Sequence, residues 1–89
     1  MCTYLTERTE VAGSAKGAGG WFGLTHATVY FDHPYHAQAE HTLNIDFSNL
    51  AGGPSARVAV ELTAESARAL VRAIEATLAS VPSGLLDPA

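Results

Sequence analysis

The sequence predicts an α+β fold: a four-stranded antiparallel meander sheet with one C-terminal helix packed on one face, in the order ββββα. The first observation is that four stretches, either rich in β-branched and aromatic residues or alternating in polarity, are separated by turn-forming residues. The second is one amphipathic segment with helical spacing near the C-terminus. At 89 residues the chain is expected to form a single domain, 1–89. The expected strands cover residues 3–12, 21–31, 40–47 and 56–62, the helix 64–81 and a tail 82–89.

The first two strands differ in character. Residues 3–12 mix β-forming residues with charges, which is typical of a sheet edge. Residues 13–20, with the sequence GSAKGAGG, are expected to be a flexible connection. Residues 21–31, WFGLTHATVYF, are rich in aromatic and β-branched residues and predict the second strand, followed by a loop over 32–39 that contains Pro34.

The third and fourth strands alternate cleanly between apolar and polar residues. This alternation fixes which side chains face the core, because a slip by one residue would turn the core outward. The expected core set is Leu43, Ile45, Phe47, Val58, Val60 and Leu62. Matching these positions predicts a register with the pairs Ile45–Val58, Leu43–Val60, Val29–Leu43 and Phe31–His41.

The helix has clear boundary signals. Thr63 stands at the N-cap position, Glu65 places a negative charge in the first turn, and Pro82 ends the segment. Its apolar residues form one stripe: Ala67, Leu70, Val71, Ile74, Leu78 and Val81. One stripe implies one buried face, so we expect the helix to lie across the sheet.

A single helix leaves the second face of the sheet open. By alternation this face carries polar side chains together with a few apolar ones: His26, Thr28, Tyr30, Thr42, Asn44, Asp46, Arg57 and Glu61, joined by Phe22 and Leu24. In the expected register His26 lies opposite Asp46, and Asp46 lies opposite Arg57. We expect this face to meet water, a small-molecule ligand or another subunit.

The composition excludes some function classes. The chain has five Lys and Arg residues and nine Asp and Glu residues, giving a net charge of −4, and its cations are scattered. A nucleic-acid or anionic membrane surface needs clustered cations, so neither partner is expected. The sequence also lacks a secretory signal or an apolar run that could span a membrane, and Cys2 is its only cysteine, so a cytoplasmic protein is predicted.

Histidines suggest a metal site. His33, His36 and His41 have the spacing H-x2-H-x4-H across the loop into the third strand, and imidazole is the commonest side-chain metal ligand. A divalent transition metal such as zinc, nickel, copper or iron is therefore a possible cofactor. The fourth ligand could be His26, or instead Asp32, Glu40 or Cys2. The alternative is that His33 and His36 are solvated and His41 caps the core.

The second candidate is a catalytic pair. Asp46 beside His26 would orient the imidazole as a general acid/base, with Tyr30 nearby. Arg57 on the far side would compete for the carboxylate and weaken its pull on the histidine. The alternative is a cross-strand polar ladder on an exposed sheet, and the sequence favours that alternative, so we lean against an enzyme.

Two further sequence features, Cys2 and the glycine-rich segment 13–20, give little support for a functional site. Cys2 would offer an amine and a thiol if Met1 were removed, but a small buried cysteine is the simpler expectation. The glycines of 13–20 match neither a dinucleotide fingerprint, because position 22 is Phe, nor a P-loop, because Lys16 is followed by glycine.

Self-association is expected. Phe22, Leu24 and Tyr30 form a partly apolar patch on the open face, and a small domain can bury such a patch in a subunit interface. The edge of the fourth strand offers a second route. A homodimer through the open sheet face or the edge of strand four is therefore predicted.

The stretches MCTYLTERTEVAGSAKG and GWFGLTHATVYFDHPYHAQAEHTLNIDF, together with the terminal helix, resemble a family of short, uncharacterised actinobacterial proteins. The resemblance covers nearly the whole chain and implies a cytoplasmic bacterial protein. It assigns no activity and no catalytic residue.

The sequence thus favours a small ligand- or partner-binding module that acts as a homo-oligomer, with a His-rich divalent metal site as its sharpest form. The alternatives are a small enzyme that uses His26 as acid/base, and a structural or regulatory protein whose histidines are incidental.

Overall fold

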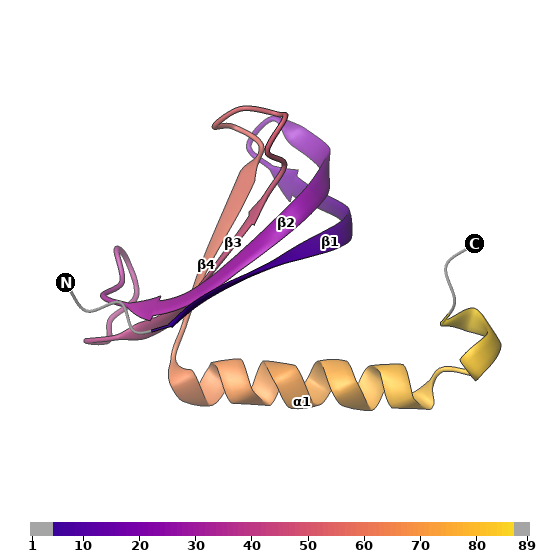
Figure 1. Ribbon diagram of the computed structural model, residues 1–89. Coiled ribbons are helices and arrows are strands. Elements are labelled where there is room, and N and C mark those ends of the chain that lie inside the picture. The colour runs from indigo at the N-terminus through magenta and orange to yellow at the C-terminus, as the bar shows by residue number, and fades with distance from the viewer. Residues whose placement is uncertain (1–4, 87–89) are drawn as a thin grey trace.

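The computed structural model describes residues 5–86 and confirms the ββββα order (Figure 1). Residues 1–4 and 87–89, and with them the expectations for Cys2, for the start of the first strand and for the end of the tail, lie outside the described residues. The elements are β1 (Thr6–Gly17), β2 (Gly20–Asp32), β3 (Thr42–Ser48), β4 (Arg57–Leu62), α1 (Ala64–Ser80) and the short 3-10 helix η1 (Ser83–Leu85).

The four strands form one antiparallel sheet in the order β1-β2-β3-β4. The expected register was wrong by two residues, since the observed pairs are Val29–Ile45, Phe31–Leu43, Ile45–Val60 and Leu43–Leu62. A shift by two keeps every side chain on its expected face, because the side chains of a strand alternate with a period of two. The alternation therefore specified the faces, whereas the connecting loops, such as the one closed by the Asn49 N–H bond to the Ala56 carbonyl at 3.0 Å, set the register.

β1 is longer than expected. The glycine-rich segment 13–20 is not a flexible connection: β1 continues to Gly17, and a two-residue turn leads directly into β2, where Gly20 has a φ of 109°. The pairing shifts between Glu10 and Gly13, which indicates a β-bulge. Small residues with weak strand propensity are held as a strand here because β2 supplies a complete row of pairing partners.

α1 begins as predicted but packs differently. The Thr63 hydroxyl accepts the Ser66 N–H at 3.1 Å, and the helix ends at Ser80. No side chain between Ala64 and Ser80 is buried, and the apolar stripe is about half exposed: Leu70 43%, Val71 55%, Ile74 51% and Leu78 52%. α1 meets the sheet near its own N-terminus, at β3 and β4, and its other half runs past the sheet (Figure 1).

Few side chains of residues 5–86 are buried. Among the described residues the buried apolar side chains are two alanines, Ala27 and Ala56, while the polar Thr42 and Asn44 are 0% and 5% exposed. The expected core set lies on the α1 side of the sheet but is only half-buried. No helix within residues 5–86 has both the length and the apolarity needed to cross a membrane.

Candidate functional site

The loop between β2 and β3 is fastened to the polar face of the sheet by one carboxylate. Glu61 of β4 accepts backbone N–H groups from Tyr35 at 2.5 Å, His36 at 3.0 Å and Ala37 at 2.9 Å. Three N–H donors converge on one carboxylate, which is an arrangement that strongly favours its charged form. Accordingly these hydrogen bonds, led by that from Tyr35, hold the pKa of Glu61 below its ordinary value of 4.5.

The polar face beneath this loop holds the two most buried side chains of residues 5–86. Thr42 is fully buried, and its hydroxyl donates to the Asn44 side-chain carbonyl at 2.7 Å. Asn44 lies between Tyr30 and Glu61 in the register, so the buried polar pair stands next to the anchor of the loop. Buried hydroxyl and amide groups need such partners, and the hydrogen bond explains how these two are accommodated.

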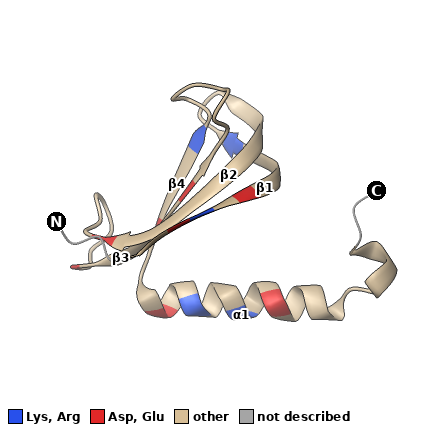
Figure 2. Cartoon of the chain, viewed as in Figure 1, with Lys and Arg blue, Asp and Glu red and all other residues tan. Residues whose placement is uncertain are grey.

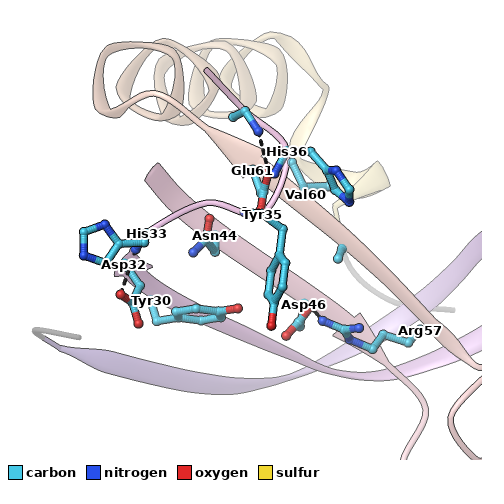
Figure 3. A pocket seen from close by; sticks show the side chains of 12 residues that line it. Tyr30, Asp32, His33, Tyr35, His36, Asn44, Asp46, Arg57, Val60 and Glu61 are labelled. Carbon is cyan, nitrogen blue, oxygen red and sulfur yellow. Dashed lines mark hydrogen bonds and ion pairs between the residues drawn. The ribbon is translucent and has the colours of Figure 1, made fainter. Parts of the chain in front are cut away.

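A pocket of about 850 Å³ opens between the loop and the polar face (Figure 3). Strands β2, β3 and β4 form its floor, and the loop forms a wall. We call it the polar-face pocket. Its lining residues are Tyr30, Asp32, His33, Tyr35, His36, Ala37, Asn44, Asp46, Arg57, Ala59, Val60 and Glu61.

Acidic side chains outnumber basic ones in the pocket. It holds three carboxylates, Asp32, Asp46 and Glu61, and one guanidinium, Arg57, which donates to Asp46 Oδ1 at 2.6 Å. Burial and then the nearby Asp46 raise the pKa of Tyr30 above its ordinary value of 10.0, while Arg57 acts in the opposite direction. The Tyr30 hydroxyl is therefore a neutral donor and acceptor at physiological pH, in a field that disfavours negative charge.

Two tyrosines frame the pocket. Figure 3 shows the hydroxyl ends of Tyr30 and Tyr35 directed toward the region of Asp46 and Arg57. Tyr30 comes from the sheet and is half-buried, whereas Tyr35 comes from the loop and is 94% exposed. The loop thus presents a large aromatic side chain to solvent at the mouth of the pocket, which is where a ligand could cover it.

His26 lies away from the polar-face pocket. The two-residue register shift places Ser48 rather than Asp46 opposite His26, so the expected His26–Asp46 cross-strand position was wrong. The His26 ring instead contacts the Thr25 hydroxyl through Nδ1 at 2.8 Å, and His26 lines a shallow depression with Arg8, Thr9, Glu10 and Leu50. Asp46 pairs with Arg57, the competitor that the sequence identified. Acid/base catalysis by His26, Asp46 and Tyr30 stays a prediction.

The four histidines lie in three places, with His26 apart from the other three. The rings of His33 and His41 lie 4.6 Å apart between centroids, and His41 also stacks on Phe31 at 5.8 Å. His36 lies beside Tyr35 instead, with ring centroids 6.4 Å apart. Over residues 5–86 no group of three His, Cys, Asp or Glu side chains is placed to hold one metal ion. The metal site of His33, His36, His41 and His26 therefore stays a prediction.

Sequence reasoning missed the anchor and the aromatic wall. Glu61 was expected only as one polar residue of the open face, and Tyr35 as a loop residue. The partners of Glu61 are backbone N–H groups, which every non-proline residue carries, so no side-chain pattern could indicate them. The one available signal was a carboxylate facing a strand–loop junction.

The sheet, the single helix and the loop-walled pocket define the class of protein: a small α+β domain with a concave site on the polar face of its sheet. The chain belongs to DUF6295, a family of unknown function that matches residues 1–87. This agrees with the expected membership of an uncharacterised family. No curated protein and no solved structure matches the chain, so the site itself must carry any functional argument.

Proposed function

We propose that this protein is a cytoplasmic binding module that holds a small organic cation, such as an amine or a guanidine, in the polar-face pocket. The observation that carries this proposal is the excess of carboxylates in a pocket framed by two tyrosine rings. The Asp, Glu and Arg side chains of the lining contribute three negative charges and one positive charge.

The charge of the pocket supports a cation over an anion. Asp46 and Arg57 neutralise each other at 2.6 Å, and the Glu61 charge is stabilised chiefly by three backbone N–H groups, with a smaller contribution from His36. The net field remains negative, in keeping with its effect on Tyr30. An ammonium or guanidinium group could donate to these carboxylates in the manner of a charge-assisted hydrogen bond.

The aromatic rings supply the second part of the recognition. Tyrosine faces attract organic cations with energies of about 0.5–1 kcal/mol at exposed sites, rising when the site is dry. The exposed Tyr35 ring could cover a ligand that lies on the sheet, while Tyr30 contacts it from below. A ligand with an apolar stem and a cationic head fits this combination.

The test is an NMR titration of the ¹⁵N-labelled chain with agmatine and phenethylamine, with succinate as the anionic control. Binding is expected to shift the amide signals of residues 30, 35–37 and 61. Asp32→Asn and Tyr35→Ala should each weaken binding about threefold to fivefold. The matched control Glu10→Gln removes a carboxylate of β1 outside the pocket and should change nothing. Equal shifts with succinate, or no shift with either amine at 10-fold molar excess and above, would refute the proposal.

A divalent transition metal is the second candidate, on the observation that the His33 and His41 rings are neighbours. The His33 Nδ1 lies 2.9 Å from the Glu40 carbonyl, and metal-binding histidines commonly donate one ring N–H to such a carbonyl. Elemental analysis of protein purified without an affinity tag should then find about one zinc, nickel, copper or iron per chain. Metal well below that ratio, with a melting temperature unchanged by chelator, would remove this candidate.

A further inference from the structure

We infer that the α1 side of the sheet is the interface of a symmetric homodimer, in which the helix of each copy lies across the apolar sheet face of the other. This inference does not depend on the ligand of the polar-face pocket, which is on the opposite face of the sheet.

The exposed area of the protomer is the first argument. Its accessible surface is 6775 Å², whereas a compact monomer of 9.3 kDa exposes about 5,000 Å². The excess of about 1,800 Å² exceeds the roughly 800 Å² that each partner contributes to a standard interface, and for two copies together it amounts to about 3,600 Å², which falls in the range of obligate homodimers. The protomer therefore exposes about as much additional surface as a stable dimer buries.

The dimensions of the protomer agree with its area. The radius of gyration is 14.7 Å, compared with about 12 Å for a compact chain of this length. The described residues include only two buried apolar side chains, both alanines. A domain of this size needs an apolar core to offset the conformational entropy that folding removes, and a core this sparse does not supply one.

The uncovered surface consists of two parts that fit each other. Where α1 meets the sheet, they enclose an apolar groove of about 530 Å³, and the helix residues that line it end at Ile74. Beyond that point the stripe continues to Leu78 with no strand beside it (Figure 1). On the sheet, the apolar face continues beyond the groove through Phe47 and Val58, and by alternation to the 71% exposed Trp21.

A second copy is the occupant that satisfies both parts at once. A two-fold axis lets one helix cover the partner's sheet while the partner's helix covers the first sheet, so a single contact is made twice. An unrelated partner would have to supply both an apolar helix face and an apolar sheet face in the same relative positions. This chain already has both.

Charge does not oppose the association. Figure 2 shows acidic and basic residues interspersed along α1. They are Glu65, Arg68, Arg72 and Glu75, which sum to zero, and Arg68 is the one charged residue that lines the apolar groove. The polar face expected from the sequence as an interface is instead partly occupied by the loop anchored on Glu61.

Sedimentation equilibrium of the full chain with Leu78→Glu as the test variant addresses this inference. Leu78 lies on the free half of α1, so a charge there should leave an isolated protomer intact but should enter the partner's apolar face. We expect the wild-type chain to sediment at twice 9.3 kDa and Leu78→Glu to raise the dimer dissociation constant about a hundredfold or more, because the leucine is buried twice in a symmetric interface.

The matched control is Ala76→Glu, which adds the same charge to the opposite side of α1 and should sediment like the wild-type chain. A wild-type chain that sediments as a monomer at 100 μM would overturn the inference. A dimer that Leu78→Glu leaves unchanged would also overturn it, because the copies would then associate through the polar face or the β4 edge.

Discussion

The two faces of the sheet differ in how far their side chains are buried. The polar face carries the most buried side chains of the described chain, Thr42 and Asn44, and a loop of the same chain is fastened over it by Glu61. The apolar face has a single helix at one end, and the apolar side chains of that helix stay about half exposed. Among residues 5–86 the two most buried side chains are therefore polar, whereas the apolar stripe of α1 is about half exposed.

This contrast reflects two different interactions: hydrogen bonds stabilise the polar face, whereas the apolar face is stabilised by the burial of apolar surface. On the polar face, the loop and the buried Thr42–Asn44 pair are held by hydrogen bonds within the chain, between residues of β3, β4 and the loop that precedes β3. The apolar face gains free energy only by excluding water, which needs area, and one helix that meets the sheet near its own N-terminus does not supply enough. In the proposed homodimer, a second copy supplies this area.

The largest effect is expected from a charge placed on the apolar face of β4, with the same charge on the polar face of β4 as its control. Val58→Lys puts an ammonium on the apolar face, and in a covered interface it should destabilise the folded protein by about 3 kcal/mol or more. Its neighbour Ala59 faces the polar side, so Ala59→Lys should change stability by no more than about 0.5 kcal/mol. Urea unfolding followed by circular dichroism measures both.

Equal stabilities of the Val58→Lys and Ala59→Lys variants would contradict the difference in burial between the two faces of the sheet. In an isolated protomer Val58 is only half-buried, and a lysine could extend its ammonium into water at little cost. Equal stabilities for the two variants would thus show that neither face is covered.

The next effect concerns the anchor of the loop. Glu61→Gln keeps the size of the side chain but replaces one acceptor oxygen with a donor, so at least one of the three backbone N–H groups loses its partner. Hydrogen exchange of the amides of residues 35–37 should become at least about tenfold faster. The matched control is Glu40→Gln, a loop carboxylate outside the pocket, and exchange that is equally fast in both variants would contradict the anchoring role.

The smallest effect is the pH dependence of the same anchor. The N–H groups of Tyr35, His36 and Ala37 lower the Glu61 pKa, so the carboxylate stabilises the fold fully above its ordinary value of 4.5. This contribution is lost as the pH falls through the lowered pKa. The amide shifts of residues 35–37 should therefore titrate with a midpoint below 4.5, and that titration should be absent from Glu61→Gln. A midpoint at or above 4.5 would exclude the three-donor arrangement.

The features of the fold that were predicted correctly are those that depend on the alternation of polarity in strands and on helical spacing. The element order, the faces of Ile45 and Val58, and the Thr63 cap followed from residue patterns that the structure reproduces. The register failed by two residues because a shift by two leaves every face unchanged, so the apolar pattern cannot detect it. Register is fixed by turn type and loop length, which the apolar alternation does not specify.

The remaining errors have a common physical cause. The strand over residues 13–17 and the fastening of the loop both depend on backbone hydrogen bonds to a distant segment, and backbone groups leave no trace in a side-chain pattern. The exposed stripe of α1 was predicted as buried because the spacing of Leu70, Ile74 and Leu78 indicates that a face will be covered, but not which chain covers it.

The thermal melting of the wild-type chain at two concentrations a hundredfold apart tests most directly whether the apolar face is completed by a second copy. Mass action then lowers the stability of the dilute sample by about 2.7 kcal/mol, which corresponds to a melting temperature lower by roughly 5–10 °C. An identical melting temperature at both concentrations, with reversible unfolding, would contradict a fold that is complete only in two copies.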